Sequence, residues 1–356
     1  MKALDLCAGI GGFRIGAELC NNVGPKIKFV AFSDIDPYAN KAYSNIFNCN
    51  SEESLGDIQN HTRSNGECSL YGMMPLSKER VNRIDIKIPD IDILFSGFPC
   101  QPHSLMGNRK GTNDSRGNIF YDIVEILRAK KPRFFILENV RAIMSVNNGE
   151  FFEELKYLLH EELKYNIEIL NFLNASDFGT PQTRRRIFII GSLDKDVSKI
   201  NIKKQNLSEA KYPTSWHLLE RKVDDKYYLS EKILKTILKN EHKGYKRKAE
   251  INKLIARPLT KTMHKMHRAS QDNYYSDSFI NGNYNIIEDR VELANSKPNR
   301  IRRITPKEAF RIQSFPEHYI DKLLHTGLSD TRLYMLAGNA VPPTMVKAVL
   351  KGLFEL

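Results

Sequence analysis

Residues 3–13, ALDLCAGIGGF, decide the fold of this chain. The first half of this segment is apolar apart from one aspartate, as in a buried β-strand, and three of the four residues at 9–12 are glycine. Glycine lets the backbone turn sharply and approach a ligand closely. We therefore expect a strand, a ligand-binding turn and a helix, in that order.

Short apolar runs alternate with amphipathic stretches through the first half of the chain. This rhythm predicts an α/β fold with a parallel sheet covered by helices on both faces, and a site at the carboxyl ends of the strands. Nearer the C-terminus, a helix over 304–313 has Thr305 as N-cap and Pro306 at its first position, and a last helix covers 343–354. The earlier expected strands are 2–7, 28–33, 91–96, 134–138, 166–174 and 186–192, and the earlier expected helices are 12–21, 37–45, 118–130 and 151–162.

Positive charge is concentrated in one part of the chain. The 356 residues carry a net charge of +12, and residues 193–300 hold 23 basic against 14 acidic residues. The strand and helix alternation is also lost there. We expect two domains, formed by residues 1–193 with 330–356 and by residues 194–329, and a polyanion such as nucleic acid as the partner of the second domain.

The composition excludes several classes of protein. With 41% hydrophobic and 27% charged residues, the chain is neither collagen-like nor disordered. Its longest apolar runs, at 91–95 and 134–137, are far shorter than the roughly 20 residues of a membrane span, so we expect a cytoplasmic protein and, by default, a monomer. The five cysteines form no Cys-x-x-Cys pair, so neither a disulfide framework nor a metal site is expected.

A nucleoside-containing cofactor fits the glycine turn. Asp34 ends the second expected strand, 22 residues after Gly12, near the offset at which an acidic side chain meets ribose hydroxyls. The glycine spacing departs from the dinucleotide fingerprint and no Gly-Lys-Ser/Thr follows, so S-adenosylmethionine fits better than a nicotinamide or triphosphate ligand. Asp57 offers a second carboxylate, for an adenine amino group; the alternative is a turn or N-cap aspartate.

Three fragments carry candidate catalytic groups. Cys100 follows a buried strand between Pro99 and Pro102, where a thiolate could act as a nucleophile; the alternative is a small buried hydrophobe. Glu138 ends an apolar strand, a position that requires a paired or protonated carboxyl group unless the residue caps a helix. Arg184 and Arg186 alternate at the start of a strand and are expected to share one face; the alternative is a charged sheet edge.

These fragments belong to a set of motifs that resembles a known family. The set resembles the ordered motifs of DNA cytosine-5 methyltransferases of the bacterial restriction–modification type. The resemblance covers about 1–192 and 300–356, and implies a Rossmann-like methyltransferase sheet with a smaller target-recognition domain. The motifs are the turn at 5–13, GFPCQPHS at 97–104, ENV at 138–140, QTRRRIF at 182–188, RRITPKEAFRIQSFP at 302–316 and GNAVPP at 338–343.

The resemblance assigns a role to each candidate residue. Cys100 would add to carbon 6 of cytosine, Glu138 would hold and protonate the ring, and Arg184 and Arg186 would contact the base carbonyl after the base is flipped out of the duplex. Cys7 replaces the phenylalanine common in the family, and Met335 stands where the family often has glutamine. The residues implied to bind S-adenosylmethionine are Asp5, Cys7, Gly9, Gly11, Gly12, Phe13, Asp34, Ile35, Asp57, Ile58, Pro99, Asn339 and Ala340.

Double-stranded DNA is the implied substrate. Ser104, Met106 and Arg116 lie in a Gly-rich and Asn-rich loop expected to close over the flipped base, with Met106 filling the gap in the duplex or packing under the loop. A run of donors in the basic segment is expected to meet DNA or to be a solvated loop that touches only phosphate. Its members are Arg257, Lys261, Lys265 and Arg268.

Three rival functions remain beside this one. A tRNA cytosine-5 methyltransferase would use the same thiolate chemistry, and a non-enzymatic nucleic-acid-binding module would have no use for Cys100, Glu138 and Arg184 together. A nucleotide-dependent dehydrogenase conflicts with the glycine spacing. A cognate restriction endonuclease encoded separately is a possible partner of a modification enzyme.

Overall fold

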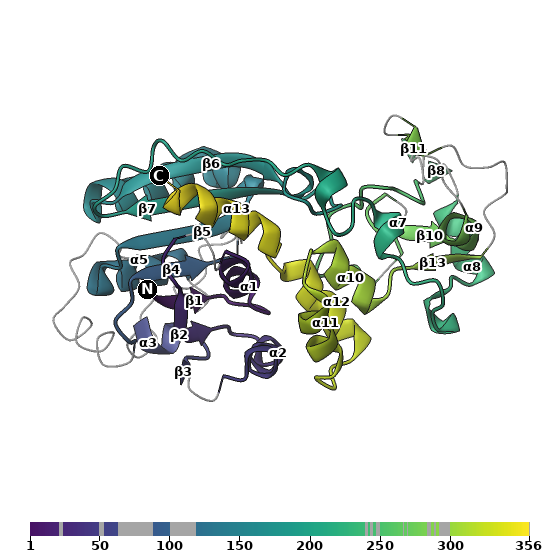
Figure 1. The fold of residues 1–356 in the computed structure, drawn as a ribbon, viewed down its shortest axis with the longest axis horizontal. Coiled ribbons are helices and arrows are strands. Elements are labelled where there is room, and N and C mark those ends of the chain that lie inside the picture. Colours follow the sequence, from purple (N-terminus) through teal and green to yellow (C-terminus); the bar gives the residue numbers. More distant parts are fainter. Residues whose placement is uncertain are drawn as a thin grey trace, which may run out of the picture. The chain divides into compact units, whose positions relative to one another are not determined.

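The computed structural model divides the chain into two compact units (Figure 1). The first unit comprises Met1–Leu173, Arg185–Lys203 and Met345–Leu356, and the second comprises Asn174–Arg184 and Lys204–Thr344. The structure describes residues 1–20, 24–49, 53–62, 88–99, 119–238, 241–242, 245–246, 250–265, 267–268, 270–282, 286–287, 290–291 and 300–355. The predicted Cys100, Ser104, Met106 and Arg116 lie outside these residues.

A mixed sheet forms the centre of the first unit. In the described part of the chain it has seven strands. The pairs from β3 through β2, β1 and β4 to β5 are parallel, whereas β7 runs antiparallel to β5. In sheet order the strands are β3 (Glu53–Ser54), β2 (Lys28–Ser33), β1 (Lys2–Leu6), β4 (Ile93–Ser96), β5 (Phe134–Val140), β7 (Arg185–Ser192) and β6 (Asn166–Asn174).

The predicted α/β class and Rossmann-like sheet are confirmed, but the predicted parallel sheet is a mixed one, because β7 runs antiparallel to β5. A parallel neighbour requires a long crossover, usually a helix. The chain between β6 and its sheet neighbour β7, residues 175–184, contains only the short 3₁₀ turn η3 (Ala175–Asp177). That connection is too short to carry the chain back across the sheet.

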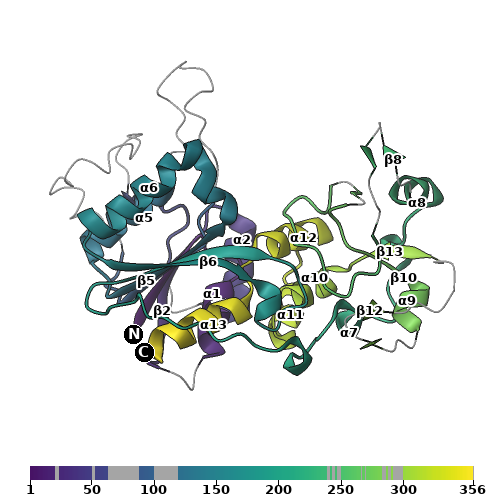
Figure 2. The ribbon, with the colours of Figure 1, turned by 90° about the horizontal axis from the view of Figure 1, so that it is seen from above.

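Helices cover both faces of this sheet. Helices α5 (Ile119–Lys130) and α6 (Glu150–Tyr157) lie on one side, and α1 (Gly12–Glu18) and α13 (Pro343–Phe354) on the other (Figure 2). The Phe13 ring of α1 lies 5.3 Å from that of Phe95 in β4, and the Phe354 ring of α13 lies 5.8 Å from that of Phe134 in β5. Around them are α2 (Pro37–Phe47), α3 (Gln59–Thr62), the 3₁₀ segment η1 (Arg141–Gly149) and the π-helical turn η2 (Leu158–Glu162).

Strand β5 is buried and tightly packed almost to its end. Every residue from Phe134 to Asn139 is buried, and only Val140 is exposed. A Cβ on Gly191 of β7 would lie 2.1 Å from the Phe135 ring, so glycine is needed for the two strands to pack. The strand is therefore held rigidly up to Glu138 and Asn139.

The second unit is built mainly from short elements. One of its two-stranded sheets pairs β10 (Tyr274–Ser276) antiparallel with β13 (Ile301–Arg303). Helix α10 (Pro306–Ile312) begins with the predicted Thr305 cap, and Thr305 and Glu308 form a reciprocal capping box. Helices α11 (Glu317–Leu324) and α12 (Asp330–Asn339) follow.

Shorter elements complete the second unit. They are η4 (Leu207–Glu209), α7 (Ser215–Leu218), η5 (Asp225–Tyr227), α8 (Glu231–Ile237), β8 (Glu241–His242), β9 (Tyr245–Lys246), α9 (Asp277–Asn281), β11 (Ile286–Ile287) and β12 (Arg290–Val291). The units differ from the predicted domains in that residues 174–184 and 330–344 group with the second unit and residues 194–203 with the first. No helix in the described residues is long and apolar enough to cross a bilayer.

Candidate active site

The glycine turn after β1 is tied to the end of β2. Gly9 and Gly11 have φ values of +56° and +77°, which favour glycine. A Cβ on Gly11 would lie 2.3 Å from the Phe47 ring, whereas a Cβ on Gly9 would meet no atom within 4 Å. The Gly9 N–H donates to Asp34 Oδ2 at 2.9 Å. The turn thus keeps one open side next to a carboxylate.

Asp34 fixes the backbone around it and leaves an apolar neighbour exposed. Its Oδ1 accepts from the Asp36 N–H at 2.9 Å, while its Oδ2 accepts from Gly9. Each carboxylate oxygen has two lone pairs and can accept a further bond. The Ile35 side chain is 75% exposed. A carboxylate for hydroxyl groups beside an apolar surface for a flat ring fits the ribose and base of a nucleoside.

Asp57 makes the contact expected for a turn aspartate. Its Oδ1 accepts from the Gln59 N–H at 3.0 Å at the start of α3. The backbone before it is held to β2, because Ser33 Oγ donates to the Gly56 carbonyl at 2.7 Å. Ile58 is 3% exposed, so its side chain belongs to the core. A nucleoside base could meet the remaining Asp57 oxygen and backbone of this turn.

Cys7 is a thiol rather than a second thiolate. It has φ +51° at the end of β1. Burial raises its pKa well above the usual range, and the negative charge of Asp34 raises it further. Asp5, on the same strand, is fully buried, and the Phe13 ring packs below the turn. Cys7 therefore contributes surface and shape, not nucleophilic chemistry.

Asn139 holds the segment that leads to Cys100. Asn139, which follows Glu138 in β5, donates from Nδ2 to the Phe98 carbonyl at 2.9 Å and is 3% exposed. The predicted Pro99 is the last described residue before Cys100 and is exposed. Sequence reasoning did not assign Asn139 a role, although it lies within the ENV motif. Its bond links the ends of β4 and β5.

Glu138 and Arg186 form an ion pair. Glu138 lies in β5, and Arg186 in β7 stands opposite Val140, so the two side chains are diagonal neighbours on one face. Arg186 Nε lies 2.6 Å from Glu138 Oε1, and the side chains are 13% and 8% exposed. This ion pair offsets the free-energy cost of burying a carboxylate at the end of the apolar strand β5. Within the described residues, Glu138 Oε2 and Arg186 Nη2 have no partner.

Arg184 precedes β7 and belongs to the second unit, and the prediction that it shares a face with Arg186 stays a prediction. β7 begins at Arg185, and the Arg184 N–H bonds to the Gln182 carbonyl in a turn instead of joining the sheet. Its guanidinium donates to carbonyl oxygens of the second unit, at Leu259 (2.9 Å), Gly338 (3.2 Å) and Ala340 (3.0 Å). Arg184 is 3% exposed.

The predicted residues of the GNAVPP motif differ in exposure. Asn339 ends α12 with an exposed side chain, and Ala340 is buried. Both belong to the second unit. Their predicted contact with the cofactor stays a prediction.

The four basic residues predicted to bind DNA fall into two pairs. Arg257 donates to the Glu250 carbonyl and carboxylate, and Arg268 donates to Thr260, Thr262 and Asp272. Lys261 and Lys265 are exposed. The guanidinium groups of the first pair thus build the segment, whereas the lysines present their charge to solvent.

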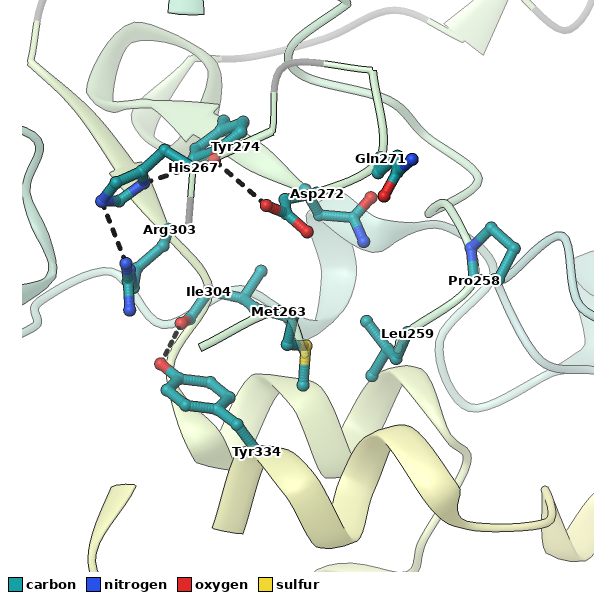
Figure 3. Close-up of a pocket in the computed structure, with 11 residues that line it drawn as sticks. Pro258, Leu259, Met263, His267, Gln271, Asp272, Tyr274, Arg303, Ile304 and Tyr334 are labelled. Carbon is teal, nitrogen blue, oxygen red and sulfur yellow. Dashed lines mark hydrogen bonds between the residues drawn. The ribbon is translucent and has the colours of Figure 1, made fainter. Parts of the chain in front are cut away.

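A pocket of the second unit contains a chain of polar groups (Figure 3). Arg303 Nη2 donates to His267 Nε2 at 3.1 Å, and His267 Nδ1 lies 3.3 Å from the Tyr274 hydroxyl. Since arginine only donates, the His267 proton is on Nδ1. Burial and the nearby Arg303 lower the pKa of His267. Leu259 and Met263 supply an apolar wall of this pocket.

The described fold is that of known methyltransferases. It superposes on the Entamoeba histolytica methyltransferase EhMeth with a TM-score of 0.69 at 20% identity, covering 100% of this chain and 98% of that one. It also superposes on the S. pombe Dnmt2 methyltransferase with a TM-score of 0.69 at 20% identity, covering 99% of this chain and 98% of that one. At this identity the likeness establishes the fold alone.

Sequence comparison establishes the family. The model of C-5 cytosine-specific DNA methylases matches residues 1–355, and the chain belongs to this family. The Type II methyltransferase M1.ScrFI of Lactococcus lactis subsp. cremoris is 34% identical over 364 residues, covering all of this chain and 78% of the relative. M.SsoII of Shigella sonnei is 32% identical, covering 99% and 80%. The protein is therefore a DNA cytosine-5 methyltransferase.

Proposed function

We propose that the protein methylates carbon 5 of cytosine within a specific sequence of double-stranded DNA, as the modification enzyme of a restriction–modification system. The family match over the whole chain and the Type II relatives support this function. They favour it over a tRNA substrate. Whether a separately encoded endonuclease accompanies the protein is part of the same proposal.

S-adenosylmethionine is the proposed methyl donor, and the end of the sheet fits it. Gly9 and Gly56 each leave open space where a side chain would begin, the Asp34 carboxylate accepts from the Gly9 N–H, and Ile35 is exposed beside Asp34 in the chain. We assign the ribose hydroxyls to Asp34, the adenine face to Ile35 and the adenine amino group to the turn at Asp57. When bound, the cofactor supplies a methyl group activated on a sulfonium.

The ion pair of Glu138 and Arg186 carries the mechanism. Glu138 Oε2 and Arg186 Nη2 retain hydrogen-bonding capacity within the described residues, next to the ion-pair contact between Arg186 Nε and Glu138 Oε1. A cytosine presents N3 and an exocyclic amine beside a carbonyl oxygen, which match a carboxyl group and a guanidinium. We therefore assign N3 and the amine to Glu138, and the carbonyl to Arg186.

The reaction uses Cys100 as nucleophile. Its thiolate forms a bond to carbon 6 while Glu138 delivers a proton to N3, which makes carbon 5 nucleophilic enough to take the methyl group. A base then removes the proton from carbon 5, the Cys100 Sγ–carbon 6 bond breaks, and N3 returns its proton. The target base must leave the duplex first. We assign that step to the loop carrying Ser104, Met106 and Arg116.

Bisulfite sequencing of plasmid DNA from cells that express the protein tests this function. We expect methylated cytosine in one sequence context, and none with Cys100→Ser. Cys49→Ser, which changes a half-buried cysteine outside the proposed site, is the matched control and should retain the pattern. Methyl transfer to tRNA but not to DNA, or full activity of Cys100→Ser, would contradict the proposal.

A further inference from the structure

The peptide group of Leu259 is held from both sides by two buried side chains. The Leu259 N–H donates to Gln182 Oε1 at 3.1 Å, and the Leu259 carbonyl accepts from Arg184 Nη1 at 2.9 Å. Gln182 is 0% exposed and Arg184 3%. Neither side chain can move without leaving a buried polar group unsatisfied. We call these two residues and their bonds to Leu259 the Leu259 clamp.

The Leu259 clamp is anchored to two helix ends. Gln182 Nε2 donates to the Ile312 carbonyl at 3.0 Å, at the end of α10. Arg184 Nη2 donates to the carbonyls of Gly338 and Ala340, at the end of α12. Because arginine is always charged and its donors form a rigid planar fork, three carbonyl partners fix its position closely. All these groups belong to the second unit.

The backbone on either side of Leu259 is held as well. The Ala256 N–H donates to the Pro181 carbonyl at 2.8 Å, and the Ala256 carbonyl accepts from the Thr183 N–H at 2.9 Å. A Cβ on Gly338 would lie 2.4 Å from the Thr260 carbonyl carbon, so only glycine allows this approach. The chain from Ala256 to Thr260 is therefore fixed along its length.

The fixed chain leads into the exposed basic turn at 261–265. Lys261 and Lys265 are exposed there, and the Lys265 N–H donates to the Thr262 carbonyl at 3.0 Å. Leu259 and Met263 also line the pocket that contains His267 and Arg303. Any shift of Leu259 would displace the side chains offered to DNA on this side of the unit.

We propose that Gln182 and Arg184 are positioning residues for sequence reading: by clamping Leu259, they fix the segment 256–265 that selects the DNA sequence, while Arg186 acts on the target base. This inference rests on the proposed function. It divides the two arginines of one short motif between different tasks. Arg186 pairs with the catalytic carboxylate, and Arg184 determines which sites are accepted.

Two variants and a randomised duplex library test this division. Arg184→Lys keeps the positive charge, but the lysine amine cannot reach all three carbonyl groups. Gln182→Met keeps the length of the side chain and removes the hydrogen bonds of the amide. We expect each variant to methylate sites that differ from the wild-type recognition sequence at one base pair more readily. The rate at such a site, divided by the rate at the wild-type site, should rise by about tenfold or more. The single-turnover rate at saturating DNA should stay within about threefold of wild type, while KM for DNA rises.

Matched controls separate the two arginine tasks. Arg185→Met removes the exposed arginine that lies between Arg184 and Arg186 in the sequence, and it should leave the preference for the DNA site unchanged. Arg186→Lys should lower the saturating rate by about 100-fold or more with site preference intact. If Arg184→Lys instead lowers the saturating rate to that extent with unchanged preference, Arg184 touches the reacting base and the proposal is overturned.

Hydrogen exchange provides a readout that does not depend on activity. In the free protein, both clamp variants should speed exchange of amides in 256–265, with Arg185→Met unchanged. Unchanged exchange in both variants would overturn the clamp. If wild-type protein methylates no DNA, the proposed function fails, and the exchange result still decides whether Gln182 and Arg184 fix this segment. Should Arg184→Lys not fold, Gln182→Met decides the outcome.

Discussion

Two buried arginine–glutamate pairs, one in each unit, differ in how fully their polar atoms are bonded. In the second unit, Arg302 Nη2 and Nη1 contact the two oxygens of Glu308 at 2.7 and 2.8 Å, and the side chains are 1% and 0% exposed. Glu308 also accepts the N–H groups of Glu220 and Thr305. In the first unit, Arg186 and Glu138 share a single contact.

The difference separates a structural pair from a reactive one. A fully bonded pair has nothing left to offer a ligand, and removing either partner leaves an unpaired buried charge. A pair with one contact and spare donor and acceptor atoms can bind a polar ring without breaking its own bond. The same two residue types therefore hold the fold at one position and, we propose, take part in catalysis at the other.

The largest expected effect is on catalysis, at the first-unit pair. Glu138→Gln keeps the size of the side chain but removes its acidic proton, so we expect the saturating methyl-transfer rate to fall by about 10²–10⁴-fold. Single-turnover transfer of a tritiated methyl group measures the rate. Glu153→Gln, at an exposed glutamate of α6, is the control, and a fall of less than about tenfold would contradict the assigned role.

The next effect is on stability, at the second-unit pair. Glu308→Gln removes the carboxylate that pairs with the buried Arg302, and we expect the free energy of unfolding to fall by about 3–5 kcal/mol. Urea denaturation followed by circular dichroism measures it. Glu231→Gln, at an exposed position of α8, should change it by less than about 0.5 kcal/mol. If Glu308→Gln lowered the free energy of unfolding by as little as this control, the second-unit pair would not be the structural pair that the comparison makes it.

A third pair, more exposed than these two, gives the smallest effect. Burial alone would raise the pKa of Glu317, but its bonds from Arg311 and Tyr212 lower it to about 2. A lowered pKa adds stability above pH about 4.5, and this stability is lost as the pH falls towards 2. We expect Glu317→Gln to cost about 1 kcal/mol at pH 7, because the pair is partly exposed.

The pH dependence of that cost is the measurement. Urea unfolding of wild type and Glu317→Gln between pH 7 and pH 3 should give curves that converge as the pH falls, because wild-type Glu317 then loses its charge. Parallel curves would show that the Glu317 charge contributes no pH-dependent stability. The result would show how much less the Arg311–Glu317 pair contributes to the free energy of unfolding than the fully buried Arg302–Glu308 pair.

Local signals predicted a large part of this structure. Hydrophobic period and turn residues placed β1, β2, β4, β5 and β7, since strand and helix periods depend on neighbours in sequence. The cap at Thr305 was predicted for the same reason: the bonding groups lie within four residues. The glycine turn, Asp34 and Glu138 were also identified as candidates, because each follows directly from a strand.

What failed required contacts between distant residues. The direction of β7 depends on how the chain returns from β6, and the hydrogen-bond partners of Arg184, which the sequence did not reveal, are carbonyl groups 75 to 156 residues away. The ion pairs of Arg257 with Glu250 and of Arg268 with Asp272 were not predicted either, and the expected contacts of these two arginines with DNA stay predictions. Asn139 was missed because its partner, Phe98, lies in another strand connection.

By itself, the sequence determined the family, the order of strands and helices along the chain, and which residue types stand at each strand end. The tertiary structure alone decided which charged groups are paired and which keep atoms available for a ligand. The physical reason is that strand and helix preferences are local, whereas the hydrogen-bonding state of a buried charge depends on every segment that folding brings within about 3 Å of it.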